Sequence, residues 1–144
     1  MRIYRTESPP ETVELGKKIG AALGSGDVVA LEAPLAAGKT VLAQGIAAAL
    51  GVRERVTSPT FTIVSEYQGK IPLYHIDVYR LDTEDDFRNI GGEELLAGQG
   101  VCVVEWSEKI ASLLDGAIRV KIRVEADGAR KITVDAPRLE GRLP

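Results

Sequence analysis

Hydrophobic positions near the start of the chain recur with the spacing of a helix. The apolar residues between positions 13 and 23 fall on one face when the segment is wound as an α-helix. Ser8 can accept a hydrogen bond from the first turn, and Pro9 has no N–H that would be left unpaired there. Gly24 is suited to end the helix. The pattern therefore predicts a helix that begins at Ser8-Pro9 and ends before Gly24.

Two runs of consecutive apolar residues, 28–31 and 101–104, predict strands that are covered on both faces, as in parallel sheets. The first run is followed by a loop of small residues over 33–38. A segment rich in alanine and leucine then predicts a helix over 39–50, which Gly51 ends. A strand, a short loop and a helix in this order are typical of an α/β sheet.

Alternating patterns predict two antiparallel hairpins. Residues 61–67 and 71–77 flank a three-residue turn, and residues 118–125 alternate between apolar and charged side chains before a turn leads into 131–134. Fully apolar strands next to helices pair parallel, whereas hairpins add antiparallel pairs. We therefore expect an α/β fold with a mixed three-layer sheet, in which antiparallel hairpins extend a parallel core.

Shorter elements complete the predicted order. Short helices are expected over 83–88 and 93–96, and Ser107 can cap a further helix through Leu114. From Pro137 the pattern is lost, so residues 137–144 are expected to form a loose C-terminal tail.

Composition and charge limit the classes of protein that fit. The chain has 144 residues, 44% of them hydrophobic and 27% charged, which suits one globular domain, expected over residues 1–136. Its 18 basic and 21 acidic residues give a net charge of −3, which favours neither bulk nucleic acid nor an anionic membrane as a partner. Cys102 is the only cysteine, so no intrachain disulfide forms. Without a signal peptide or a membrane-spanning run, the chain is expected to be cytoplasmic.

Gly38-Lys39-Thr40 opens the helix over 39–50 directly after the small-residue loop, which is the order found in phosphate-binding loops. The N–H groups of such a loop and of the helix N-terminus point at one spot and favour an anion there. Lys39 would add a positive charge for β- and γ-phosphates, and Thr40 a hydroxyl ligand for Mg²⁺. The alternative interpretation is a plain strand-to-helix turn.

The loop departs from the usual glycine pattern. Ala33 stands where that pattern has glycine, Pro34 has no N–H to offer, and Ala36 replaces a further glycine. Alanine is strained by roughly 1–2 kcal/mol where φ is positive. We therefore expect weak nucleotide binding, which glycine at positions 33 and 36 and aspartate at 34 would strengthen.

Two carboxylates follow predicted strands. Glu105 comes directly after the apolar run 101–104, and Asp77 ends the strand over 71–77. Strand ends on one side of a wound sheet gather around a ligand, so both are candidates for Mg²⁺, with Glu105 preferred as the direct or water-bridged ligand. Each could also be a surface acid. His75 is interpreted as a half-buried strand residue, and a single histidine and a single cysteine exclude a Cys/His metal site.

A run of hydroxyl residues over 57–62 precedes the first hairpin. It has two interpretations. One is a turn, and the other is a segment whose hydroxyl or N–H groups respond to the γ-phosphate of a nucleotide.

These motifs together resemble the bacterial P-loop ATPase family of tRNA threonylcarbamoyladenosine biosynthesis, TsaE (also called YjeE). The resemblance covers about residues 8 to 135 and rests on residues 26–31, 37–40, 58–62, 73–81, 91–94 and 104–106. It implies a P-loop NTPase-like sheet, ATP or ADP and Mg²⁺ as cofactors, and weak ATP hydrolysis by the protein alone. It also implies that the protein acts together with the protein subunits of a transferase complex. That complex transfers a threonylcarbamoyl group to adenosine 37 of tRNAs reading codons that begin with A. The tRNA is then an indirect partner, and no membrane is involved.

The resemblance also implies roles for particular residues. Lys39 binds phosphate, Thr40 and Glu105 bind Mg²⁺, and Asp77 is a switch-like acid near the γ-phosphate and a further metal candidate, so that the expected catalytic set is Lys39, Asp77 and Glu105. The residues expected to contact the nucleotide are Ala36, Ala37, Gly38, Lys39, Thr40 and Val41 at the phosphates, and Thr6, Ser8 and Arg130 at the adenine. Trp106 is expected on a surface that faces a partner or senses the nucleotide.

Two other functions fit the pattern less fully. A small P-loop kinase would need a lid with several arginines, and the only candidates, Arg53 and Arg55, directly follow the helix over 39–50. A GTPase would need an Asn-Lys-x-Asp motif, which the sequence lacks. A non-hydrolysing interaction module with a degenerate phosphate loop is the other alternative, and Ala33, Pro34 and Ala36 favour it.

Overall fold

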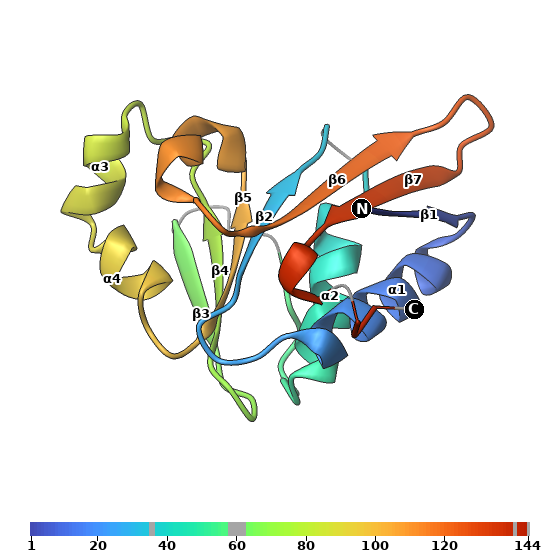
Figure 1. Ribbon diagram of the computed structural model, residues 1–144, viewed down its shortest axis with the longest axis horizontal. Coiled ribbons are helices and arrows are strands. Elements are labelled where there is room, and N and C mark those ends of the chain that lie inside the picture. The colour runs from blue at the N-terminus through green and yellow to red at the C-terminus, as the bar shows by residue number, and fades with distance from the viewer. Residues whose placement is uncertain (35–36, 58–62, 140, 144) are drawn as a thin grey trace.

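A mixed sheet organises the chain in the computed structural model, which describes residues 1–34, 37–57, 63–139 and 141–143 (Figure 1). Among these residues the sheet has seven strands in the order β1-β7-β6-β2-β5-β4-β3. The strands are β1 (Arg2–Thr6), β2 (Val28–Glu32), β3 (Val64–Tyr67), β4 (Leu73–Asp77), β5 (Val101–Glu105), β6 (Ile118–Val124) and β7 (Arg130–Asp135). The helices are α1 (Pro9–Ala22), α2 (Lys39–Ala49), α3 (Glu84–Asn89) and α4 (Gly92–Leu96), with 3₁₀ helices η1 (Ser107–Leu113) and η2 (Pro137–Leu139).

The centre of the sheet is parallel and its margins are antiparallel. Strand β2 pairs parallel with both β5 and β6, and β4 pairs parallel with β5. The pairs β3–β4, β6–β7 and β1–β7 are antiparallel. The predicted α/β architecture, a parallel core extended by antiparallel hairpins, is therefore confirmed.

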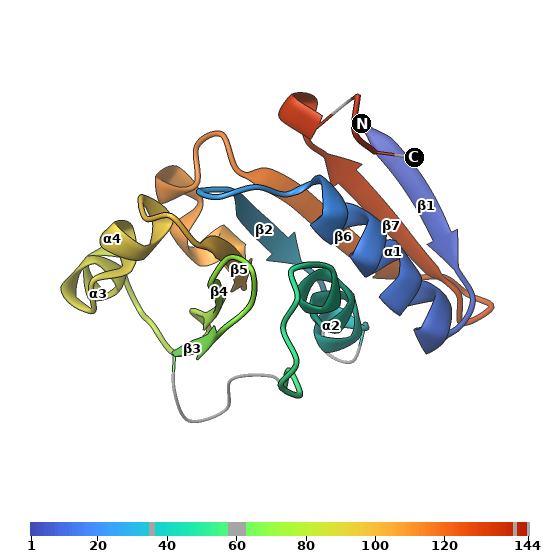
Figure 2. The ribbon, with the colours of Figure 1, turned by 90° about the horizontal axis from the view of Figure 1, so that it is seen from below.

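Helices cover both faces of the parallel strands. Helices α1 and α2 lie on one face, and α3, α4 and η1 lie on the other (Figure 2). Successive residues of a strand point to opposite faces, so Val29 and Leu31 pack beneath α1 and α2, whereas Ala30 joins the cluster on the other side. This double burial explains why β2 and β5 are apolar up to the glutamate that ends each strand, and it confirms the predicted three layers.

At β6, β7 and β1, only one of the two faces of the sheet is covered. In β6 the side chains of Ile118, Val120 and Ile122 are buried against the helix side, and the residues between them are exposed. Figure 2 shows α1 on one side of these strands, with no helix on the other. The strict alternation of apolar and charged residues in β6 follows from this one-sided cover.

Three local predictions differ from the structure. Strand β1 was not predicted, because an edge strand with one covered face needs few apolar residues, here chiefly Tyr4 packed against the core. Element η1 is a 3₁₀ helix, and the Ser107 hydroxyl donates to the Leu31 carbonyl instead of capping a helix. Of the residues that the structure describes from Pro137 onward, Leu139 and Leu143 are buried in the core, where a loose tail was expected.

Helices α1 and α2 meet at glycines. A Cβ atom on Gly45 would lie 2.2 Å from the Val13 carbonyl oxygen, and one on Gly16 would lie 2.4 Å from the Leu42 carbonyl oxygen. Neither position has room for a side chain, so the two backbones touch.

Within the described residues, no helix has the length and apolar character needed to cross a membrane.

Replacing Gly45 with alanine should force the two helices apart. We expect a loss of unfolding free energy of about 1–3 kcal/mol, the usual cost of overpacking, although alanine is the better helix former. Thermal denaturation measures it, with Gly141→Ala as the control, because nothing lies within 4 Å of a Cβ at that position. Equal melting temperatures for Gly45→Ala and the parent would show that the helices tolerate separation.

Candidate functional site

The carboxyl ends of three parallel strands meet at one edge of the sheet. The strand register places Leu31 of β2 opposite Glu105 of β5, and Glu105 opposite Asp77 of β4. The chain that leaves β2 at this edge runs through Gly38 into α2, whose first residue is Lys39. Sequence positions that are far apart therefore supply two carboxylates and a lysine to one place.

The loop before α2 turns on a glycine. Gly38 has φ of 104°, a left-handed conformation that favours glycine, and it directly precedes the helix. Ala37 is fully buried, and its carbonyl oxygen accepts a hydrogen bond of 2.9 Å from Arg130 Nε of β7. The loop is thus attached to the antiparallel margin of the sheet. Ala36, expected to contact phosphate, lies outside the described residues, as does Leu35.

The prediction that alanine at position 33 is strained is wrong. Trp106, with φ of 60°, is the only non-glycine residue of positive φ in the described part of the chain. Ala33 therefore has a backbone conformation that alanine adopts without cost. Of the positions that the structure describes in this loop, Gly38 is the one that requires glycine.

Glu105 is the buried centre of the site. Only 2% of its side chain is exposed, and Lys39 Nζ lies 3.6 Å from its Oε1. Its other oxygen, Oε2, forms a hydrogen bond with His75 Nε2. His75 is fully buried rather than half-buried, and Nδ1 of its ring has no partner among the described residues. No local pattern indicates this contact, because His75 and Glu105 meet only through the pairing of β4 with β5.

The two carboxylates have opposite pKa shifts. Burial alone would raise the pKa of the Glu105 carboxyl. The hydrogen bond with His75, together with the electrostatic attraction of His75 and Lys39, outweighs this effect, so the pKa is lowered. Burial raises the pKa of Asp77, and the neighbouring Glu105 adds to this against the opposing hydrogen bond from the Tyr79 N–H. Glu105 is thus held as an anion, whereas Asp77 takes up a proton more readily than an exposed aspartate.

Aromatic rings cover the lysine. Lys39 Nζ lies 4.7 Å from the centre of the Trp106 ring, a cation–π distance, and the Trp106 and Tyr79 rings are 4.8 Å apart. Tyr79 is 55% exposed, so this stack leads from the buried lysine to the surface. Lys109 in turn lies over the Tyr79 ring, 5.0 Å from its centre.

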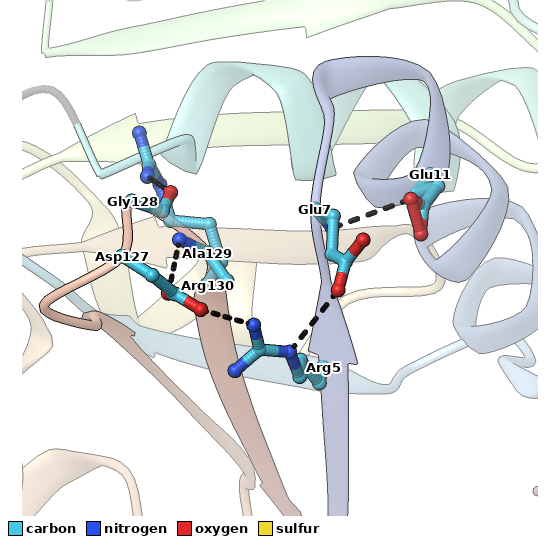
Figure 3. Close-up of polar contacts among 7 residues, drawn as sticks. All are labelled: Arg5, Glu7, Glu11, Asp127, Gly128, Ala129 and Arg130. Carbon is cyan, nitrogen blue, oxygen red and sulfur yellow. Dashed lines mark hydrogen bonds and ion pairs between the residues drawn. The ribbon is translucent and has the colours of Figure 1, made fainter.

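A cavity of about 320 Å³ opens beside the loop. It lies between the first turns of α1 and α2 and the β6–β7 turn, and it is lined by Glu7, Ser8, Pro9, Thr12, Gly38, Val41, Gly128 and Arg130. Figure 3 shows how its rim is held: Arg5 bonds both Glu7 and Asp127, and Arg130 bonds the Gly128 carbonyl. The size is within the range of small-molecule sites.

The structure brings most of the expected residues to two adjoining places. Lys39, Asp77 and Glu105 gather at the strand ends, with Thr40 in the first turn of α2 beside Lys39. Gly38, Ser8, Val41 and Arg130 line the cavity. Thr6 is 4% exposed and does not line the cavity, but its hydroxyl lies 2.7 Å from that of Thr12, which does.

Some functional candidates were missed, and others lie beyond what the structure describes. Glu7, Thr12 and Gly128 line the cavity, and no sequence motif had singled them out. Residues 58–62 of the hydroxyl run lie outside the described residues. Within the described residues, no three His, Cys, Asp or Glu side chains form a cluster that could hold a metal by themselves.

Known proteins with the same sequence pattern and fold exist. The family of threonylcarbamoyl adenosine biosynthesis protein TsaE matches residues 6–132. The tRNA threonylcarbamoyladenosine biosynthesis protein TsaE of Treponema pallidum is 47% identical over 130 residues, covering 90% of this chain and 96% of that protein. Its counterpart in Bacillus subtilis is 44% identical over 135 residues, covering 92% of this chain and 84% of that protein. The crystal structure of Bacillus subtilis YdiB superposes with a TM-score of 0.75 at 39% identity, covering 94% of this chain and 84% of that one.

Replacing Glu105 with glutamine should destabilise the fold at neutral pH. Removing one partner of a buried ion pair costs about 3–5 kcal/mol. Because the pKa of Glu105 is lowered in the fold, its contribution is complete above the unfolded pKa and is lost as the pH falls through the folded value. We therefore expect the difference between parent and variant to shrink in acid.

Urea denaturation between neutral and acidic pH measures that difference. Glu32→Gln is the control, because Glu32 also ends a strand of the parallel core but half of its side chain is exposed. Equal losses for both variants, or a difference that grows in acid, would contradict the assignment of Glu105 as a buried, stabilised anion.

Proposed function

Since the chain belongs to the TsaE family and thus to tRNA threonylcarbamoyladenosine biosynthesis, we propose that it is an ATP-binding, weakly ATP-hydrolysing accessory protein. It would be required for threonylcarbamoylation of adenosine 37 in tRNAs that read codons beginning with A. The observation that carries this proposal is the pairing of Lys39, at the first turn of α2, with the buried carboxylate of Glu105, next to a cavity of about 320 Å³.

The phosphates would lie at the N-terminus of α2. Backbone N–H groups there have no partner within the helix and favour an anion. Lys39 already faces an anion, the Glu105 carboxylate, so a β- or γ-phosphate can take over a contact for which the lysine is placed. When Lys39 moves to the phosphate, Oε1 of Glu105 becomes available to another cation.

The residues present fit Mg²⁺ bound together with a nucleotide. Mg²⁺ keeps several waters and takes only one or two carboxylates besides phosphate oxygens, so a cluster of three acids is not needed. Thr40, Glu105 and Asp77 supply a hydroxyl and two carboxylates at this edge of the sheet. The ion would neutralise charge on the phosphates, and Glu105 remains our choice for the direct or water-bridged ligand.

The adenine would occupy the cavity between α1 and the β6–β7 turn. Val41 offers an apolar contact there, and Ser8 and Arg130 offer polar ones. Arg130 also bonds Ala37 of the loop, so the same side chain links the adenine end to the phosphate end. Thr6 would act indirectly, by orienting Thr12 through their hydroxyl contact.

The partners would be the protein subunits of the tRNA threonylcarbamoyl transferase complex. The tRNA would be met only through that complex, in the cytoplasm and without a membrane. Tyr79 and Trp106 connect Lys39 to the surface, so a partner that touches Tyr79 could sense whether Lys39 is engaged by phosphate. Turnover of ATP would then reset the complex.

Two alternatives lead to different outcomes in solution. A non-hydrolysing interaction module would bind the partner subunits without Mg·ATP or Mg·ADP. A small kinase would bind the nucleotide and transfer its γ-phosphate to an added acceptor. Calorimetric titration with Mg·ADP and Mg·ATP, followed by an ATPase assay with and without candidate acceptors, separates the three.

Replacing Lys39 with alanine should abolish nucleotide binding, because the charge that faces the phosphates is lost. Lys39 is 8% exposed and pairs with Glu105, so the variant should also lose stability while still folding. Calorimetry measures binding, and circular dichroism checks the fold. Lys17→Ala on the exposed side of α1 is the control. A folded Lys39→Ala protein with the affinity of the parent would place the site elsewhere.

Replacing Ala33 with glycine should leave nucleotide affinity within about twofold of the parent. The conformation of Ala33 has no positive φ for glycine to relieve, so there is no strain to release on binding. The added freedom of the unfolded chain should lower stability by about 0.4–1 kcal/mol. Titration of both proteins with Mg·ADP decides, since a tenfold gain in affinity would restore the strain argument.

A further inference from the structure

One polar side chain in the layer beneath α2 is not explained by packing. His75 of β4 is fully buried, and its neighbours on this face of the sheet are Leu73 and Val103, which both belong to the apolar core. An apolar residue would pack there without a polar atom to satisfy. Of the buried side-chain polar atoms that the structure describes, Nδ1 of His75 is the one without a hydrogen-bond partner. A buried polar atom without a partner is rare enough to call for a reason other than packing.

The other nitrogen of the ring has the Glu105 carboxylate as its partner. Nε2 of His75 forms a hydrogen bond with Oε2 of Glu105, across the parallel pair of β4 and β5. An ionised carboxylate can only accept hydrogen bonds, so Nε2 is the donor. Because His75 is fully buried, it cannot touch a bound nucleotide, and any effect that it has on the site must pass through Glu105.

The two oxygens of Glu105 have different partners. Oε1 faces Lys39, and Oε2 accepts from His75. In the proposed function Lys39 turns to a phosphate, which frees Oε1. Among the described residues, the bond from His75 is then the contact that still orients the carboxylate. Asp77 differs, because its carboxylate accepts from the Tyr79 N–H, a group of its own chain segment.

We propose that His75 is a positioning residue for the magnesium site, an inference that rests on the proposed function. It holds Oε2 of Glu105, so that Oε1 stays turned toward the first turn of α2 and is ready for Mg²⁺ when the nucleotide binds. Hydrogen bonds to a ligating group fix its orientation, and removing such an outer partner typically weakens metal binding by about 10- to 100-fold. His75 is not a ligand itself, since Nε2 is taken by Glu105 and Nδ1 is buried.

The reach of the side chain at position 75 tests this role. His75→Gln keeps an N–H donor at the level of Nε2, whereas His75→Asn offers its donor at the level of Nδ1, too short for Glu105. We expect Mg²⁺ to strengthen ADP binding by His75→Gln within about threefold of the parent, and by His75→Asn at least about tenfold less. Without Mg²⁺, both variants should bind ADP within about twofold of the parent, because Lys39 and the start of α2 are unchanged.

Calorimetric titration with ADP, in excess Mg²⁺ and in EDTA, measures this effect as the ratio of two dissociation constants. General damage to the fold weakens both and leaves the ratio unchanged, so the ratio separates positioning from a merely structural role. Circular dichroism checks that each variant folds. Tyr74→Phe is the control on β4, because Tyr74 packs against the cluster on the other face of the sheet, and it should leave both constants as in the parent.

A measurement on the unmodified chain does not depend on how a variant folds. His75 is the only histidine, so its ring nitrogens can be assigned in a ¹⁵N NMR spectrum without ambiguity. Nε2 should carry a hydrogen, and its signal should shift when Mg²⁺ is added to the ADP-bound protein, because a cation at Oε1 weakens the bond that Oε2 accepts. An Nε2 without a hydrogen, or a signal that does not respond to Mg²⁺, would overturn the inference.

The outcomes for the variants separate this role from the proposed function. Equal strengthening by Mg²⁺ in His75→Asn and in the parent would show that His75 only fills the core, and would leave the proposed function intact. A loss in His75→Gln as large as that in His75→Asn would also overturn the role, because a restored donor would then have no effect. If the parent bound neither ADP nor ATP, the proposed function would be wrong, and the role of His75 would fall with it.

Discussion

The buried carboxylate of Glu105 is the group on which the arrangement of the site depends. One oxygen faces Lys39 of α2 and the other bonds His75 of β4, so a single side chain at the end of β5 joins three elements. An anion without these partners would be costly at such burial. The start of α2 and the middle of β4 are therefore held in place relative to β5, and a lysine is kept near the strand ends, where the proposed phosphate would compete for it.

Much of the fold could be predicted because its signals are local. The runs 28–31 and 101–104 are apolar throughout because both faces of those strands are covered, and β6 alternates because only one of its faces is. Strand β1 has no comparable signal, since its pairing with β7 depends on main-chain groups that any sequence provides. The contact between His75 and Glu105 was hidden for a related reason: it depends on which strands are neighbours, and β4 and β5 are joined by α3 and α4.

The loop before α2 shows where motif spacing stops being informative. Spacing identified Ala33 and Gly38 as positions where glycine is usual, but it says nothing of backbone torsion. In the structure Gly38 needs the freedom of glycine, and Ala33 does not. Replacement of a motif glycine is therefore harmful only where the chain has positive φ or where a neighbouring group comes close, as at the glycines between α1 and α2.

The close approach of α1 and α2 has a consequence for ligand recognition. Ser8 and Thr12 at the start of α1 and Gly38 and Val41 at the start of α2 line the same cavity, and the glycine contacts further along lock the two helices side by side. The walls of the cavity are thus preorganised: they do not have to be assembled when a molecule enters. The entropy lost on binding falls mainly on the ligand, so even modest contacts can give useful affinity.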